Sequence, residues 1–171
     1  MQIRIARPKD LEQIVNIYNQ AITEGNCTAD ITPLTVSQQK EWFSGHNPDK
    51  YPIYVMEEEK EEKKIITGWC SLSAHRRGRM ALQHVAEISY YVEKNQRRKG
   101  IGRQLMAHAL QEAPKLGLHN LFAILLDINE TSIAMLEKNG FSKWGHLPEI
   151  AEFPDRICGQ FIYGRKVGVK L

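Results

Sequence analysis

The segment from residue 92 to 105, VEKNQRRKGIGRQL, gathers the residue types that bind phosphate. An apolar strand pattern precedes it and an amphipathic helix pattern follows it, so the segment is predicted to be a turn leading into a helix. Backbone N–H groups at the start of a helix are unpaired and attract anions. Glycines let an anion approach the backbone closely, and basic side chains add positive charge. The candidate residues for this site are Arg97, Arg98, Lys99, Gly100, Ile101, Gly102 and Arg103.

Two other kinds of phosphate-binding loop are excluded by the pattern. The chain lacks the GxxxxGK[ST] motif of P-loop proteins and the GxGxxG motif of dinucleotide-binding domains. Because glycine spacing alone is a weak signal, a tight turn without any ligand remains the alternative interpretation of the segment.

The elements around this turn follow from the spacing of apolar residues. Residues 2–6 and 85–92 have strand patterns, and helical spacing follows Pro8 and Asp10. Further helices are predicted at 35–43, 100–116 and 132–139, and further strands at 52–56, 65–74, 120–126, 141–147 and 158–167. Loops are predicted at 24–33, 57–64, 76–80 and 148–156. This order predicts a single mixed α/β domain over residues 1–171.

Length and composition narrow the class of protein. A chain of 171 residues with 42% hydrophobic and 25% charged residues fits one globular domain. No run approaches the ~20 apolar residues that span a bilayer, and the N-terminal segment lacks the apolar core of a signal peptide. Three widely spaced cysteines and histidines without ligand spacing argue against disulfides and metal sites. We therefore expect a cytoplasmic protein with no metal and no membrane partner.

The net charge of +3 does not by itself indicate a nucleic-acid partner. Positive charge is clustered at residues 76–79 and 97–99, but the clusters lack the interleaved aromatic residues that single-strand binders use. No nucleic-acid partner is expected.

Two motifs in the second half of the chain carry a family resemblance. The spacing Arg97-x-x-Gly100-x-Gly102 resembles the [QR]xxGx[GA] signature of the GNAT acetyltransferases. Residues 129–141, NETSIAMLEKNGF, resemble the second landmark of that superfamily. The two motifs occur in the expected order, and the resemblance extends from Ile3 to about Lys166.

Shorter segments resemble the phosphinothricin acetyltransferase group within this superfamily. They lie at residues 6–10, 17–19, 86–92 and 145–147. The resemblance implies the GNAT fold, with a mixed central sheet of about seven strands and helices on both faces. It also implies acetyl-CoA as co-substrate and an amine as acceptor.

The resemblance assigns roles to residues around the turn. In this superfamily the turn binds the pyrophosphate of coenzyme A. The resemblance also implies that the strand at 85–92 separates from its neighbour near residues 90–92, which would leave backbone groups of Tyr91 and Val92 for the pantetheine arm. Asn129 is implied as a further cofactor contact, although asparagine is also a common helix N-cap.

Glu87 is the implied general base. Attack on a thioester needs a neutral amine, and amino-acid amines are largely protonated near neutral pH, so a base must take the proton. Apolar neighbours flank Glu87 on its strand, and burial would raise its pKa above the usual ~4.3. A glutamate at this position is taken as the base in the resembled group. A surface or salt-bridged carboxylate is the alternative.

One position departs from the family pattern. Many GNAT enzymes carry a tyrosine, the general acid for the leaving thiolate, where this chain has Leu136. Either Tyr90, Tyr91 or Tyr163 takes that role, or the thiolate leaves without help, because a thiol has a low pKa.

The acceptor implied by the subgroup is a small-molecule amine, such as an amino acid, methionine sulfone, methionine sulfoximine or phosphinothricin. Loops at 25–32, 75–80 and 149–156 are expected to rim its pocket, with Arg77 and Arg79 as candidates for binding a carboxylate. A homodimer is common in that group. A protein or peptide acetyltransferase and a non-catalytic CoA-binding sensor remain the alternatives.

Overall fold

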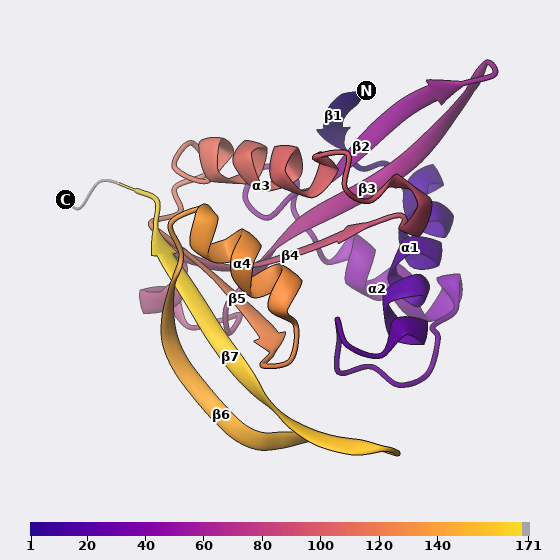
Figure 1. The fold of residues 1–171 in the computed structure, drawn as a ribbon. Coiled ribbons are helices and arrows are strands. Elements are labelled where there is room, and N and C mark those ends of the chain that lie inside the picture. Colours follow the sequence, from indigo (N-terminus) through magenta and orange to yellow (C-terminus); the bar gives the residue numbers. More distant parts are fainter. Residues whose placement is uncertain (169–171) are drawn as a thin grey trace.

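The computed structural model describes residues 1–168 and places a seven-stranded sheet between two groups of helices (Figure 1). The strands are β1 (Gln2–Ile5), β2 (Ile53–Lys60), β3 (Lys63–Ala74), β4 (Val85–Val92), β5 (Asn120–Leu126), β6 (Ser142–Phe153) and β7 (Arg156–Lys166). The helices are α1 (Leu11–Glu24), α2 (Val36–Ser44), α3 (Ile101–Glu112) and α4 (Glu130–Lys138), with short 3-10 helices η1 (Pro8–Asp10), η2 (Met80–Leu82) and η3 (Lys94–Gln96). The predicted fold class is confirmed.

The sheet has a partial split at its centre. Its strand order is β1-β2-β3-β4-β5-β7-β6, and among the described residues β4 and β5 form the parallel pair while the other neighbours are antiparallel. The β4–β5 ladder joins only Val85–Glu87 to Asn120–Phe122. Beyond Glu87 the two strands separate, so the predicted splay near residues 90–92 is confirmed and begins already at Ile88.

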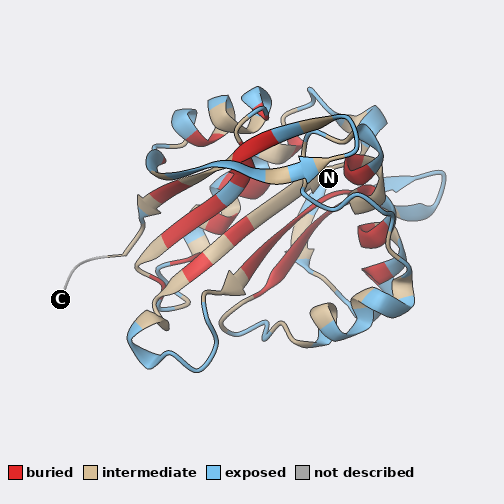
Figure 2. Ribbon diagram, turned by 90° about the horizontal axis from the view of Figure 1, so that it is seen from below, coloured by how far each residue is buried: buried red, intermediate tan, exposed pale blue. Residues whose placement is uncertain are grey.

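Helices cover the two faces of the sheet with separate apolar clusters. On one face α3 and α4 bury side chains such as Leu105 and Leu136, which are fully inaccessible to solvent. On the opposite face α1 packs Ile14 and Ile17 against Val55 and Trp69. Buried residues accordingly concentrate along the central strands and the inner faces of the helices (Figure 2). The central strands next to the split are therefore covered by packed helices on both faces of the sheet.

The helix predicted at 100–116 is shorter than expected. It starts at Ile101, directly after Gly100, and its regular part ends at Glu112. Pro114 explains the early end, because proline has no backbone N–H to donate to the carbonyl four residues earlier, which interrupts the helical hydrogen bonds. Helix α2 starts where the sequence predicts, with Thr35 and Gln38 forming a reciprocal capping box.

The loop predicted at 148–156 is wrong. Strand β6 continues to Phe153 and pairs with β7, which starts at Arg156, so the two strands form one long hairpin. Pro148 is accommodated because β6 is an edge strand with an irregular register between Leu147 and Ala151. Most β6 side chains are exposed, so alternating hydrophobicity gave no sign of the strand.

The solvated turn predicted at 57–64 is also only partly correct. Strand β2 runs to Lys60, and Glu61 and Glu62 form the tight turn with positive φ angles of 49° and 61°. Glu57 is buried, and its carboxylate binds the Arg4 guanidinium with an oxygen–nitrogen distance of 2.5 Å. The charged segment 57–64 therefore includes one residue, Glu57, that belongs to a buried network of ion pairs.

Candidate active site

The turn before α3 has the geometry of an anion-binding site. Gly100 adopts φ +79° and precedes the first helical residue, a conformation that favours glycine over residues with a side chain. Among residues 1–168, no carbonyl or side chain accepts a hydrogen bond from the backbone N–H groups of residues 98–103. These donors are therefore available to a ligand at the positive end of the helix.

Gly102 keeps the space above this helix end open. A Cβ atom at position 102 would lie 3.5 Å from the Met135 sulfur and 3.6 Å from Val92, which are ordinary contacts. The protein would thus tolerate a methyl group here, so packing does not require the glycine. The turn fits a pyrophosphate, which needs close approach to several N–H groups.

The basic side chains of the turn differ in whether they already have hydrogen-bond partners within the protein. The guanidinium of Arg97 is held by the Glu24 carboxylate and by the Val92 carbonyl, 3.3 Å from Nε. Lys99 donates to Gln96 at 2.8 Å. Arg98 and Arg103 are exposed and have no hydrogen-bonded partner among the described residues. Together with the free backbone donors, these two guanidinium groups are available to meet phosphate charge.

The register of β4 decides which backbone groups face the split. The Val85 carbonyl accepts from His75, and the Glu93 N–H donates to Thr67, so odd-numbered positions direct their backbone groups toward β3. The Tyr91 carbonyl accordingly faces Gly68 of β3. Even-numbered positions, including Tyr90 and Val92, direct theirs toward the separated β5. Val92 thus lies as predicted, whereas Tyr91 turns its backbone away from the split.

Two adjoining cavities lie on the α1 face of β4. Their volumes are about 330 and 340 Å³. Five residues line both cavities: Tyr18, Asp30, Glu87, Ser89 and Tyr91. The first extends beneath α1 and α2, and the second extends to β5 and β7 past the end of the β4–β5 ladder. Together they form a hollow large enough for a small molecule beside the split.

Glu87 lies where the two cavities meet. The side chain is half-buried, and burial raises the pKa of its carboxyl group. No hydrogen bond or ion pair to the Glu87 carboxylate occurs among residues 1–168, so the salt-bridged alternative is not observed. A carboxylate with a raised pKa and no partner, in a cavity, is suited to proton transfer.

Comparison with known proteins identifies the family of the chain. Residues 11–141 match the model of the Acetyltransferase (GNAT) family. The chain belongs to this family. It is an acetyl-CoA-dependent N-acetyltransferase, and the resemblance to the phosphinothricin acetyltransferase group is confirmed by individual relatives.

Relatives of this GNAT protein match it over most of their length. YwnH of Bacillus subtilis (strain 168), named provisionally as a phosphinothricin acetyltransferase, is 38% identical over 98% of this chain and 99% of its own. A Pseudomonas paraeruginosa protein named L-methionine sulfoximine/L-methionine sulfone acetyltransferase is 32% identical over 88% of this chain and 85% of its own. The crystal structure of a GNAT superfamily phosphinothricin acetyltransferase from Sinorhizobium meliloti, in complex with acetyl-CoA, is 26% identical, with a TM-score of 0.88, over 98% of this chain and 88% of that chain.

The cavity walls of the GNAT domain include residues that the sequence did not single out. Tyr18 packs edge-on against Tyr91, with 4.9 Å between ring centroids, and Trp42 lies 5.6 Å from Trp69. The Tyr18 hydroxyl donates to Asp30 at 2.5 Å. These residues come from α1, α2, β3 and the loop after α1, and no local sequence signal links them.

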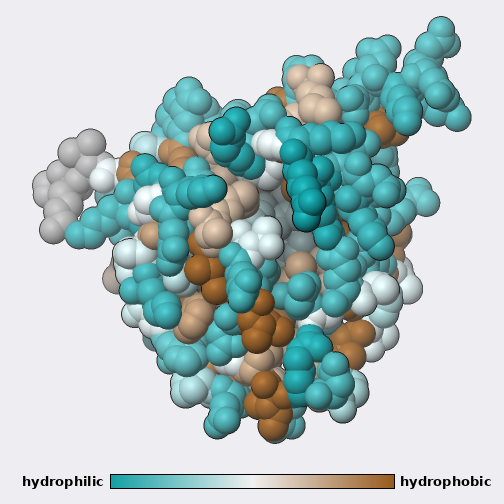
Figure 3. Space-filling view, viewed as in Figure 1, coloured by the Kyte–Doolittle hydropathy of each residue, from teal (hydrophilic) through white to brown (hydrophobic). Residues whose placement is uncertain are grey.

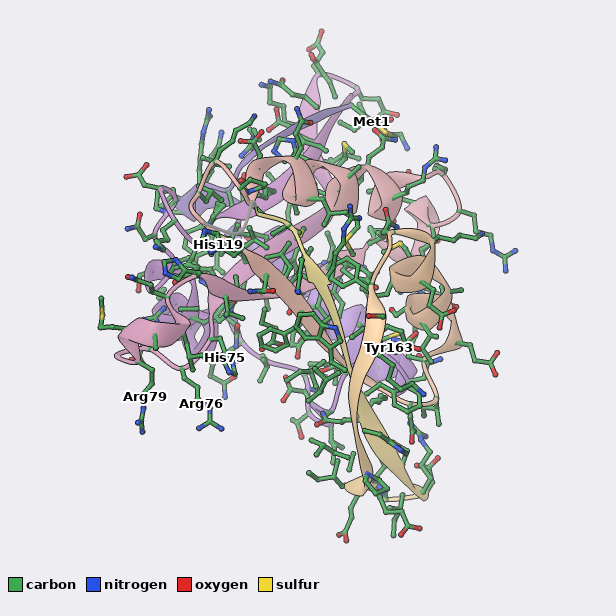
Figure 4. The ribbon with its side chains drawn as sticks, turned by 90° about the vertical axis from the view of Figure 1, so that its left-hand side faces the viewer. Met1, His75, Arg76, Arg79, His119 and Tyr163 are labelled. Atoms are coloured by element: carbon green, nitrogen blue, oxygen red, sulfur yellow. The ribbon has the colours of Figure 1, made fainter. Side chains whose placement is uncertain are left out.

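The three loops expected to rim the pocket have different outcomes. Thr28, Ala29 and Asp30 of the first loop line the cavities, as predicted. No residue of loop 75–80 lines either cavity, and Arg77 instead donates to the Gly45 carbonyl at 2.5 Å. Arg76 and Arg79 extend outward at one end of the domain (Figure 4). The third segment is the β6–β7 hairpin, and Arg156 binds the first loop through the Gly25 carbonyl.

Asn129 and Leu136 occupy the second family landmark. The Asn129 side chain caps α4 by accepting from the Ser132 N–H at 3.1 Å, and the residue is buried. Leu136 is fully buried among apolar side chains. Tyr163 donates its hydroxyl proton to Glu137 at 3.0 Å, near α4 (Figure 4). The cap interpretation of Asn129 is therefore confirmed, and Tyr163 is engaged away from the cavities.

Among residues 1–168, histidine, cysteine and carboxylate side chains do not gather in groups of three that would hold a metal ion. Within the same range, none of the helices combines the length and apolar character that crossing a bilayer requires.

Proposed function

We propose that this enzyme acetylates the amino group of a free amino acid or a close analogue, with Glu87 as general base. Methionine sulfone, methionine sulfoximine and phosphinothricin are the acceptors to test first, because the names of the similar proteins mention them. The observation that carries the proposal is the position of Glu87, half-buried in a cavity directly beside the β4–β5 split.

Acetyl-CoA is proposed to bind along the split, with its pyrophosphate at the start of α3. The free N–H groups of residues 98–103 and the guanidinium groups of Arg98 and Arg103 support this placement. Arg97 and Lys99 add positive charge from their places beside Glu24 and Gln96. The remaining proposed contacts are Val92, Gly100, Ile101, Gly102 and Asn129, whereas Tyr91 turns its backbone toward β3.

The acceptor is proposed to enter the cavity on the α1 face of β4. Its ammonium group would meet two carboxylates, Asp30 and Glu87, and the aromatic walls favour a cation through their ring faces. Glu87 then removes one proton, and the neutral nitrogen attacks the thioester carbon. A raised pKa suits this step because it brings the base closer to the pKa of the amine.

The experiment is thiol release from acetyl-CoA across a panel of amino acids that includes the three named acceptors, with a panel of peptides beside it. Rapid release with a small amino acid supports the proposal. Release only with peptides supports a protein or peptide acetyltransferase. Tight CoA binding by calorimetry with no release on either panel supports a sensor and contradicts the proposal.

A homodimer is also proposed, with the β5–β7–β6 face as its interface. Ile124, Trp144 and Leu147 are 40%, 50% and 39% exposed, which is high for large apolar side chains. The surface around the hairpin combines hydrophilic regions with separate hydrophobic patches (Figure 3). Trp144→Lys should shift the mass in analytical ultracentrifugation from dimer to monomer, and a monomeric parent would contradict the proposal.

Residues 1–171 are proposed to form a single domain located in the cytoplasm. The domain proposal rests on the continuous sheet that joins β1 to β6. Localisation can be tested by fractionating cells that express a tagged chain.

A further inference from the structure

The hydroxyl group of Tyr90 is buried and has no hydrogen-bond partner among the described residues. Burial of an unpaired hydroxyl is unfavourable, because the group loses its hydrogen bonds to water without replacement. Native structures leave few such groups, and each calls for an explanation. The roles proposed for the cofactor turn and for Glu87 do not involve this hydroxyl.

Tyr90 lies on the part of β4 that has separated from β5, three residues after Glu87. Because side chains alternate along a strand, Tyr90 and Glu87 point to opposite faces of the sheet. Glu87 lines the cavities on the α1 face, whereas Tyr90 packs against the apolar cluster beneath α3 and α4. Beside the split, β4 thus carries one polar side chain on each face of the sheet.

Acyl transfer removes a proton from the acceptor nitrogen and develops negative charge on the leaving sulfur, so different groups can assist the two atoms. The acceptor nitrogen forms its bond to carbon on the side of Glu87, which takes the proton. The carbon–sulfur bond then breaks, and its electron pair leaves with the sulfur as a thiolate. Since the pyrophosphate is proposed to lie at the α3 turn, the pantetheine arm approaches from the α3 side, where Tyr90 lies.

We infer that the Tyr90 hydroxyl donates a hydrogen bond to the sulfur of acetyl-CoA and stabilises the thiolate as it leaves. This inference rests on the proposed function, since it assumes that acetyl-CoA binds along the split. It identifies Tyr90 among the three tyrosines considered from the sequence. Tyr163 is bonded to Glu137, and the Tyr91 ring lies in the acceptor cavity.

The pKa values of the Tyr90 hydroxyl and of a thiol indicate whether Tyr90 donates a hydrogen bond or transfers a proton. Burial raises the pKa of Tyr90 to about 12, well above the usual thiol value of ~8.5. A phenol this weakly acidic keeps its proton beside a thiolate, so it acts as a hydrogen-bond donor and not as the source of a transferred proton. The donor is present at every working pH, and the thiolate leaves without receiving a proton from Tyr90.

Ser132 in the first turn of α4 provides the alternative explanation for the hydroxyl. It is the side chain on α4 that lowers the Tyr90 pKa slightly through a polar interaction, although no hydrogen bond satisfies the geometry. If Ser132 were the working partner in solution, Ser132→Ala would have the same effect as Tyr90→Phe. The inference instead expects Ser132→Ala to behave like the parent.

The first test needs no acceptor. Coenzyme A is bound to the parent, to Tyr90→Phe and to the control Tyr163→Phe, and its thiol is titrated by the ultraviolet absorbance of the thiolate. A donor beside the sulfur lowers the thiol pKa, so the parent and the control should hold about tenfold more thiolate than Tyr90→Phe at the same pH. Equal titrations of all three complexes would overturn the inference.

The second test is steady-state turnover with an acceptor found by thiol release. Tyr90→Phe should reduce kcat about 10- to 100-fold, the range for a hydrogen bond to a charged group, with acetyl-CoA affinity changed less than about threefold. The factor should be the same at every pH, because Tyr90 stays protonated. Loss of affinity with unchanged kcat would overturn the inference in favour of a pantetheine contact.

The two tests separate failure of the inference from failure of the proposed function. A lowered thiol pKa in the parent but not in Tyr90→Phe, without turnover on any amine, would retain Tyr90 as the sulfur's donor and reject the amino-acid acceptor. Turnover on an amino acid, with Tyr90→Phe unchanged in both tests, would retain the function and reject the inference.

Discussion

Arg97 and Glu24 form an ion pair in which one guanidinium nitrogen, Nη1, lies 2.7 Å from Oε1 and 2.8 Å from Oε2 of the carboxylate. Arg97 belongs to the turn before α3, and Glu24 is the last residue of α1, directly before the loop that lines the acceptor cavities. The pair therefore connects the proposed cofactor turn to the acceptor loop.

Because Arg97 is engaged with Glu24, we predict that the two exposed arginines of the turn bind acetyl-CoA more strongly. Arg98→Ala and Arg103→Ala should each raise the Kd of acetyl-CoA about 5- to 20-fold, the loss of one charge-assisted hydrogen bond. Arg97→Ala should change that Kd less than about fivefold, since a partly exposed ion pair contributes at most ~1 kcal/mol. Calorimetric titration measures all three variants.

The matched variant for this prediction is Glu24→Gln, which removes the same ion pair without touching the turn. Arg97→Ala and Glu24→Gln should both raise the acceptor KM, because the loop at 28–30 loses its anchor. If Arg97→Ala weakens acetyl-CoA binding as much as Arg98→Ala does, the guanidinium reaches the pyrophosphate in the complex.

We predict different effects for the two glycines of the turn. Gly100→Ala should destabilise the fold by ~1 kcal/mol, because φ at this position is +79°. Gly102→Ala should leave the free energy of unfolding within ~0.5 kcal/mol of the parent, since the added methyl makes only ordinary contacts. It should still weaken acetyl-CoA binding roughly tenfold by crowding the phosphate. Denaturant unfolding and calorimetry separate the two effects, and unchanged affinity in Gly102→Ala would exclude close approach at this position.

Glu87→Gln is predicted to reduce kcat about 10²- to 10⁴-fold, the usual contribution of a general base, with little change in acetyl-CoA affinity. In the parent, kcat should rise with pH through the raised pKa of Glu87, because only the ionised carboxylate accepts a proton. The variant should lack this limb of the profile. A parent profile that the variant reproduces at lower amplitude would assign the limb to another group.

The same carboxyl group is predicted to destabilise the fold at neutral pH. Its pKa is raised in the folded chain, so the folded state binds more protons than the unfolded state between the two pKa values. Stability from this group is present below the unfolded pKa of ~4.3 and declines as pH rises through the folded pKa. Glu87→Gln should therefore increase the Tm at pH 7 more than at pH 4, as measured by differential scanning calorimetry.

Arg4 is predicted to be essential for stability because it neutralises two buried carboxylates. Its guanidinium lies 2.7 Å from Asp10 and 2.5 Å from Glu57. Burial alone would raise the pKa of Asp10, but hydrogen bonds from Arg4 and the Arg7 N–H lower it, and hydrogen bonding to Arg4 also lowers the pKa of Glu57. Arg4→Met should cost ~3–5 kcal/mol in urea unfolding at pH 7, since it removes the ion partner of buried Asp10 and leaves Glu57 with the exposed Lys64.

The pH dependence provides the control for the Arg4 prediction. The lowered pKa values stabilise the parent above the unfolded carboxyl values, and this stability is lost as pH falls through the folded values. The difference between parent and Arg4→Met should therefore shrink in acid. A difference independent of pH would indicate lost packing in place of lost charge pairing.

The cofactor turn could be predicted from sequence because its determinants are local. Glycine at a left-handed position, unpaired donors at a helix start and clustered basic residues all lie within seven residues, 97–103. Glu87 could be proposed as the base from the family resemblance and from its place on the strand that leads into the turn. The backbone direction of Tyr91 could not be predicted in this way. It depends on which positions of β4 form hydrogen bonds with β3, and only the register of the two strands reveals this.

The acceptor cavity could not be predicted in the same way. Tyr18, Asp30, Trp42 and Trp69 are distant in sequence, and each has an ordinary local explanation as a helix, loop or strand residue. The β6 extension was missed because an edge strand exposed on both faces lacks alternating hydrophobicity. Long-range packing assembles both features, and a single sequence records no trace of it.

The short β4–β5 ladder also makes the stability of the folded chain depend on a bound ligand. Past Glu87 the central strand has a strand partner on one side among the described residues, so its amide protons there should exchange fastest within the inner sheet. A ligand that binds along this strand stabilises the fold by RT ln(1 + [L]/Kd), or ~2.7 kcal/mol at a hundredfold excess over Kd. Acetyl-CoA bound along this strand would thus slow the exchange of these amide protons and raise the free energy of unfolding.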